Sequence, residues 1–183
     1  MKFLALLPQL LGVAFALSYD DPIPPKQPIT FLGTFSNMRY TEEHQYGYAV
    51  ELWQAGDVLF GHFLASDGLA GDTPLGLMEN LEYTPATGVL SFSAKLTSGT
   101  HLCKKHKGVP SRDLFRFAGR LMGKRILGTV RELDGLHDNQ PTRTEKVELK
   151  REKPEGEDLP SPKKYGEWKE ESDLLLKARG PKW

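Results

Sequence analysis

The sequence is poor in cysteine, and its charges balance. Cys103 is the only cysteine among 183 residues, so no disulfide can form within the chain. Lysine plus arginine and aspartate plus glutamate each number 24, so no overall field attracts nucleic acid or an anionic membrane. No Asn-x-Ser/Thr acceptor for N-glycosylation occurs. The fold must therefore be held by its apolar core, and neither nucleic acid nor a membrane is an expected partner.

Common catalytic motifs are also missing. The chain contains no Gly-x-Ser-x-Gly elbow, no His-Glu-x-x-His pair and no glycine-rich phosphate loop. No long helical pattern lies between the strand-like runs, which excludes a parallel α/β sheet. The expectation of an enzyme is lowered without being removed, and no cofactor is expected.

The first residues differ from the rest of the chain. Lys2 is followed by the apolar run Phe3 to Leu17 and then by polar residues. This pattern is typical of a secretory signal peptide, here residues 1–18, with cleavage after Ala16 or Ser18. The run is too short for a membrane-spanning helix. We therefore expect a secreted or periplasmic protein, with an uncleaved anchor or a mis-assigned start as the alternative.

Behind the signal, residues 19–28 are expected to form a proline-rich linker. Eight runs that follow are rich in β-branched and aromatic residues and are bounded by turn formers. They cover Thr30 to Ser36, Gln45 to Gln54, Val58 to Ala65, Leu77 to Tyr83, Val89 to Leu96, Asp113 to Leu121, Arg125 to Glu132, and Arg143 to Arg151. Short turns alternate with longer loops between them. Residues 29–151 are therefore predicted to form an all-β domain, an eight-stranded antiparallel up-and-down barrel, with a two-sheet sandwich as the alternative.

A short motif supports the barrel. Gly33-Thr34-Phe35 in the first predicted strand resembles the Gly-x-Trp opening of lipocalins and avidins, and Leu32 and Asn37 flank it in a similar way. Phenylalanine replaces the tryptophan, and neither the later lipocalin motifs nor a biotin-contacting set is present. The resemblance thus implies a calycin-like architecture and no particular ligand.

In such a meander the longer loops all leave the same end of the barrel. That end is the predicted mouth. The predicted ligand-binding residues are aromatic residues on the strands and polar residues in or beside the loops: Tyr48, Phe60, Phe92, Phe115, Phe117, His44, Asp72, His101 and His137. Zinc or copper ligands are available at His101, Cys103 and His106, but the neighbouring lysines would repel a dication. We expect a solvated basic loop there and no metal site.

Three functions are compatible with these patterns. The favoured one is non-enzymatic binding of a small, mainly apolar ligand or a protein partner at the long-loop end. The first alternative is a secreted hydrolase or isomerase that uses histidine and glutamate at the mouth. The second is a structural or assembly module whose Trp168 segment docks on another protein.

Residues 152–183 read as a charged, proline-containing tail. Within this tail, Tyr165, Trp168 and Leu174 to Leu176 are spaced to form a short helix with an apolar stripe. The stripe is expected to dock on the barrel, with docking on a partner as the alternative.

Overall fold

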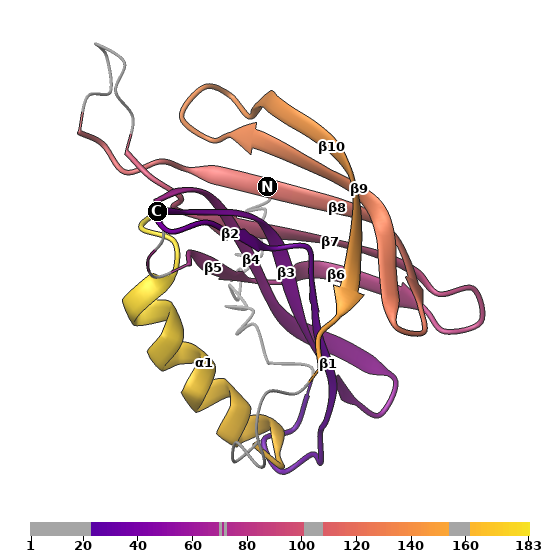
Figure 1. The fold of residues 1–183 in the computed structure, drawn as a ribbon. Coiled ribbons are helices and arrows are strands. Elements are labelled where there is room, and N and C mark those ends of the chain that lie inside the picture. Colours follow the sequence, from indigo (N-terminus) through magenta and orange to yellow (C-terminus); the bar gives the residue numbers. More distant parts are fainter. Residues whose placement is uncertain (1–22, 70, 72, 101–107, 154–161) are drawn as a thin grey trace, which may run out of the picture.

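The strands of the computed structural model form one antiparallel sheet that curls into a nearly closed barrel (Figure 1). The structure describes residues 23–69, 71, 73–100, 108–153 and 162–183. The strands are β1 (Thr30–Ser36), β2 (Arg39–Tyr40), β3 (His44–Ala55), β4 (Val58–Leu69), β5 (Leu75–Leu77), β6 (Glu79–Thr84), β7 (Val89–Leu96), β8 (Asp113–Met122), β9 (Arg125–Asp134) and β10 (Gln140–Arg151), and one helix, α1 (Tyr165–Arg179), follows them. The sheet order is β5-β4-β3-β1-β10-β9-β8-β7-β6, with β2 beside β3. The predicted antiparallel barrel is confirmed, and the two-sheet sandwich is not formed.

The predicted number of eight strands is wrong, because the sheet has ten. The strand expected over Leu77 to Tyr83 is interrupted at Met78, so that β5 pairs with β4 whereas β6 pairs with β7. Asn80, at a φ of 51°, lies where the register between β6 and β7 shifts, between Glu79 and Glu82. The two-residue β2 escaped prediction because it is too short to show any alternation.

The seam between β5 and β7 is closed by close packing and by the C-terminus. A side chain at Gly76 would overlap the carbonyl oxygen of Lys95 in β7, so this approach requires glycine. Beyond α1, the Trp183 indole donates a hydrogen bond to the carbonyl of Leu96 over 2.8 Å. The end of the chain thus lies against the end of β7.

The main core lies in the barrel interior. Its side chains come from alternate positions of the strands, as the period of two requires. The buried members are Phe35, Tyr48, Val50, Leu52, Leu59, Phe63, Ala65, Leu90, Phe92, Ala94, Leu96, Phe115, Phe117, Ile126, Val130, Val147 and Leu149.

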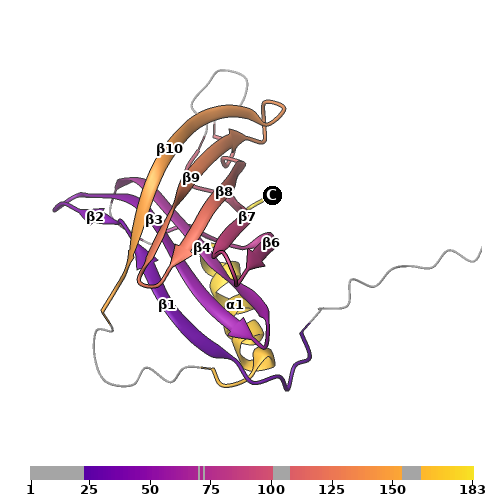
Figure 2. The same cartoon turned by 90° about the vertical axis from the view of Figure 1, so that its right-hand side faces the viewer.

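A second core lies outside the barrel, where α1 covers β3 and β4 (Figures 1 and 2). Trp53 and Phe60 point away from the interior and pack against Tyr165 and Trp168 of the helix. Because the barrel interior buries one face of β3 and β4 and α1 buries the other, both faces of these two strands are apolar in sequence. Alternation alone cannot identify the inner face of a strand that is buried on both sides.

The predicted helix is present and docks on the barrel, but its predicted stripe is partly wrong. Its buried residues are Tyr165, Trp168 and Ser172, which follow the helical spacing of 3.6 residues per turn. Leu174 and Leu175 are 65% and 39% exposed, because they fall off this face. Within the described residues, no helix has the length and apolar character that a membrane crossing requires.

The end of the proline-rich segment lies against the start of α1. The backbone N–H groups of Tyr165 and Gly166 donate to the carbonyls of Gln27 and Pro25 over 2.9 and 2.8 Å. A helix leaves such N-terminal donors without partners of its own. Ile23, 3% exposed, joins the second core. Residues 23–28, expected to be a linker, are therefore packed against the body, whereas residues 1–18 lie outside the described residues.

Candidate functional site

The longer connections leave the same end of the barrel. The antiparallel pairing places the ends of β4, β7 and β9 beside the starts of β3, β8 and β10. The tight turns at 56–57, 85–88 and 123–124 lie at the other end. Because the strands run further than predicted, to Leu69 and Asp134 for β4 and β9, the connections at this mouth are shorter than expected.

Aromatic side chains pack against one another inside the barrel. Tyr48 lies 5.8 Å from Phe63 and 6.3 Å from Phe115 between ring centroids. Phe92 stacks on Phe117 at 5.1 Å. These five side chains form an aromatic layer, and four of them were predicted as ligand-binding residues. An apolar layer of this kind is typical of a small-molecule site in a barrel.

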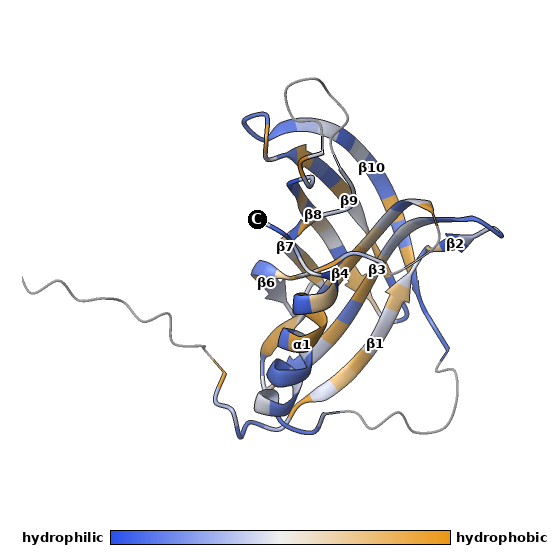
Figure 3. Ribbon diagram, turned by 90° about the vertical axis from the view of Figure 1, so that its left-hand side faces the viewer, coloured by the Kyte–Doolittle hydropathy of each residue, from blue (hydrophilic) through white to orange (hydrophobic). Residues whose placement is uncertain are grey.

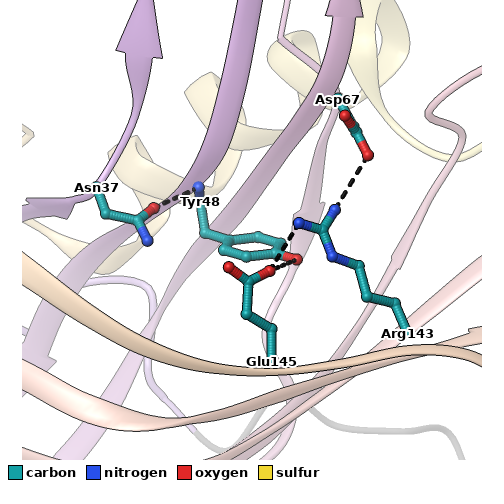
Figure 4. A network of polar contacts seen from close by, with 5 residues as sticks. All are labelled: Asn37, Tyr48, Asp67, Arg143 and Glu145. Carbon is teal, nitrogen blue, oxygen red and sulfur yellow. Dashed lines mark hydrogen bonds and ion pairs between the residues drawn. The ribbon is translucent and has the colours of Figure 1, made fainter.

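Charged side chains at inward positions of β10 and β4 surround the Tyr48 hydroxyl (Figure 4). Arg143 of β10 pairs with Asp67 of β4 at 3.0 Å and with Glu145 at 2.8 Å. The Tyr48 hydroxyl donates to Glu145 over 3.3 Å. We call Tyr48, Asp67, Arg143 and Glu145 the clasp, since their contacts join β10 to β3 and β4.

The clasp residues and the neighbouring carboxyl of Glu132 influence one another electrostatically. Burial raises the pKa of Tyr48 to about 12, while the Arg143 charge opposes this rise and Glu145 adds to it. Burial, followed by the charge of Asp113, raises the pKa of Glu132, and Arg143 again opposes the rise. Because its pKa is raised, Tyr48 stays neutral, with its hydroxyl proton in place, throughout the physiological pH range. Titratable groups with shifted pKa values are frequent in functional sites.

Asp113 anchors the loop that follows β7. Its Oδ2 atom accepts hydrogen bonds from the backbone and hydroxyl of Ser98, at 2.9 and 2.7 Å, and from the Ser111 hydroxyl at 2.5 Å. Asp113 is 8% exposed. This buried carboxylate fixes both ends of the longest connection at the mouth.

The structure brings together only part of the predicted site. Phe60 is in the second core under α1 and not in the interior, because its position in β4 has the outward parity. His44 stacks on Tyr46 at 5.8 Å near the start of β3. His137, in the β9–β10 turn, contacts Asp134 at 2.7 Å. Asp72 and His101 lie outside the described residues, as do Cys103 and His106.

The charged residues of the mouth were missed by sequence reasoning. Arg143 and Glu145 share the face of Val147 and Leu149, so the period of two already placed them inward. They were overlooked because charged residues are usually assigned to solvent. Asp67 lies beyond the predicted end of its strand at Ala65, whereas the structure extends β4 to Leu69.

A serine, a histidine and a glutamate meet elsewhere, between the barrel and α1. His62 Nδ1 lies 3.0 Å from Glu51 Oε2, and His62 Nε2 lies 2.7 Å from the Ser172 hydroxyl. The order resembles a catalytic triad. However, His62 and Ser172 are only 3% and 2% exposed, and the N–H groups around Ser172 are bonded within the helix. No substrate can reach this hydroxyl, so the contact fixes the helix to the sheet.

A shallow groove of about 600 Å³ crosses the outer face of β6, β7 and β8, and it is lined mainly by polar side chains such as Glu79, Ser93, Lys95 and Arg116. Among the described residues, no three histidine, cysteine or acidic side chains are grouped to hold a metal ion.

Comparisons with protein-family models, with curated proteins and with solved structures give no match. The chain is therefore characterised by its fold, an antiparallel barrel backed by one helix, and by the aromatic and charged layers at its mouth.

Proposed function

We propose that this protein binds a small, mainly apolar molecule inside the barrel at its long-loop end. The observation that carries the proposal is the contact between the charged groups and the aromatic layer: charged groups at inward positions surround the hydroxyl of Tyr48, whose ring packs against Phe115. The rings provide apolar contact area, and the polar groups near the opening can orient a ligand. Barrels of about eight strands include some that are filled by their own side chains and some that hold one small ligand.

The proposal is tested with a neutral fluorescent probe, N-phenylnaphthylamine, titrated into the protein. Ala65, 4% exposed, faces the interior opposite Tyr48 on the neighbouring strand. Ala65→Phe should therefore place an additional ring beside Tyr48, where the ligand is proposed to lie, and abolish probe binding. The matched control is Ala118→Phe, which places the same ring on the outer face of β8.

Loss of binding in Ala65→Phe with retention in Ala118→Phe supports the interior site. The opposite pattern would move the site to the outer groove and overturn the proposal. Circular dichroism verifies that Ala65→Phe is folded, because overpacking typically costs about 1–3 kcal/mol.

The enzyme alternative has one observation in its favour. Glu132 has a raised pKa and lies on the strand beside Arg143, facing the same interior as Tyr48. A carboxyl group of this kind is suited to proton transfer. A broad screen of ester and isomerase substrates tests this alternative: turnover that is lost in Glu132→Gln and kept in Glu148→Gln would favour it over simple binding.

The signal-like segment supports export. We propose that the protein is secreted or periplasmic, and that the mature chain begins after Ala16 or Ser18. N-terminal sequencing of protein from an exporting host tests this, and an intact Met1 would contradict it.

The assembly alternative, in the form that uses Trp168, loses its support. Trp168 is 6% exposed and is packed into the chain's own second core. It is therefore not available to a partner while α1 is docked.

A further inference from the structure

The barrel wall is interrupted beside β10. This strand pairs with β9 from Gln140 to Lys150, but with β1 it pairs only through Lys150 and Arg151. β2, which continues the wall along the edge of β3, pairs with β3 alone. β2 and the upper part of β10 diverge from this point (Figure 2). No backbone ladder joins these two described strands.

The divergence follows from the sequence around Asn37. Its side-chain oxygen accepts the N–H of Tyr48 at 2.8 Å, and its own N–H donates to the Tyr48 carbonyl at 3.0 Å. Gly47, at a φ of 117°, makes room for it, because a Cβ there would approach the Asn37 oxygens at 2.8 and 2.9 Å. The chain is thereby held against β3 when it leaves β1, and it continues away from β10.

Apolar packing does not seal the interrupted wall. Residues 140–146 of β10 are hydrophilic, whereas Val147 and Leu149 below them belong to the core (Figure 3). Instead, the clasp crosses from β10 to β3 and β4 (Figure 4). Arg143 and Asp67 are 45% and 67% exposed. Exposed ion pairs contribute only about 0.2–1 kcal/mol each and are weakened by salt.

We propose that the wall between β2 and β10 is a side portal into the barrel, and that the clasp holds it closed. The Tyr48 ring, whose hydroxyl belongs to the clasp, packs against Phe115 in the main core, and Val147 is also part of that core. A ligand of the kind given under Proposed function, on which this step rests, would pass between the strands when Arg143 releases Asp67 and Glu145 releases the Tyr48 hydroxyl. Local opening is favoured where few buried apolar contacts must be broken.

A simpler role for the same residues must be distinguished. Inward-pointing charges on an edge strand also prevent pairing with other chains. That role requires no opening, and it predicts that access to the interior is independent of the clasp.

The first test measures opening without any ligand. In a Cys103→Ser background, Val147→Cys places a thiol on the inner face of β10, where Val147 is 6% exposed. Its rate of labelling by a soluble thiol reagent is compared with and without Arg143→Met. We expect an increase of about fivefold, since a loss of roughly 1 kcal/mol in clasp energy changes a population by that factor. Added salt should raise the rate in the parent protein and have less effect in Arg143→Met.

Two controls make the result specific. Arg125→Met removes an ion pair with Glu148, also on β10, but on the outer face near the opposite end. Its labelling rate should equal that of the parent. A thiol at Ala94→Cys, 0% exposed on β7, reports general unfolding and should not respond to Arg143→Met. Equal rates for Val147→Cys with and without Arg143→Met would overturn the portal, as would an equal acceleration at Ala94→Cys.

The second test measures the association rate of N-phenylnaphthylamine, which carries no charge to be steered. Arg143→Met should bind the probe about fivefold faster than the parent, and Arg125→Met at the parental rate. Probe binding that is equally fast in all three proteins would overturn the portal while leaving the proposed function intact. Absence of probe binding together with faster thiol labelling would overturn the proposed function and leave the portal.

Discussion

Trp168 should be the side chain whose loss most weakens the attachment of α1, and Trp168→Ala tests the second core directly. The indole is 6% exposed, and its ring lies 4.6 Å from Phe60, 5.2 Å from His62 and 5.6 Å from Tyr165 between centroids. A buried aromatic side chain removes about 150–250 Å² from water, which corresponds to roughly 4–6 kcal/mol at 25 cal/mol per Å². Because truncations of buried tryptophan cost about 3–5 kcal/mol, we expect a loss of about 4 kcal/mol.

The assay is urea unfolding, with Leu174→Ala as the matched control on the same helix. Leu174 is 65% exposed, so its truncation should change the free energy of unfolding by less than about 0.5 kcal/mol. Trp53, which lies in the second core, should report the loss of the helix as a red shift of its fluorescence. A loss below about 1 kcal/mol for Trp168→Ala, or one equal to that of Leu174→Ala, would refute the reasoning from burial.

Three further predictions concern single polar groups. Ser172→Ala should destabilise the protein by about 1–3 kcal/mol, because the buried His62 Nε2 loses its partner; an equal effect of Ser91→Ala, at an exposed hydroxyl, in the same unfolding assay would argue against it. Glu132→Gln should stabilise the protein at neutral pH, and this gain should shrink as the pH falls. The reason is that the pKa of Glu132 is raised in the folded state, so its contribution to stability is complete below the pKa of the unfolded chain and is lost as the pH rises through the pKa of the folded protein. A pH series of unfolding curves in which the two proteins differ by a constant amount would contradict this. Tyr48→Phe should remove a tyrosine that ionises near pH 12. It should also remove a contribution to stability that is complete below pH about 10 and is lost as the pH rises to about 12. Alkaline titration of tyrosinate absorbance checks this, and a curve that the substitution leaves unchanged above pH about 11 would show that Tyr48 is not the group with the raised pKa.

Alternation predicted the barrel well wherever one face of a strand meets solvent. In β7, alternation puts Leu90, Phe92, Ala94 and Leu96 on one face, and all four are 0–4% exposed. The rule failed for β3 and β4, because α1 buries their outer face as well. The helix itself was predictable from its spacing, but the inward faces of the strands that it covers were not.

The candidate site was harder to predict for a different reason. Its aromatic layer follows from apolar alternation, whereas the clasp joins residues that are distant in sequence, such as Asp67 and Arg143. No local pattern shows which inward charges will meet across a barrel. The contact between His62 and Ser172 is similar: it depends on where α1 docks, and that position is set by the aromatic packing of Trp168 and Tyr165.

The two sides of the barrel are stabilised in different ways, and this difference supports the choice of β10 as the moving element. β3 and β4 are paired over their full lengths and are packed on both faces, inside the barrel and under α1. The upper part of β10 has one paired edge and a polar sequence, and an exposed ion pair between Arg143 and Asp67 joins it to β4. Since regions with few buried apolar contacts open at the lowest free energy, the barrel should open on the β10 side while the helix-covered side stays in place. The helix therefore serves the mouth indirectly, by making one wall rigid enough for the other to move against it.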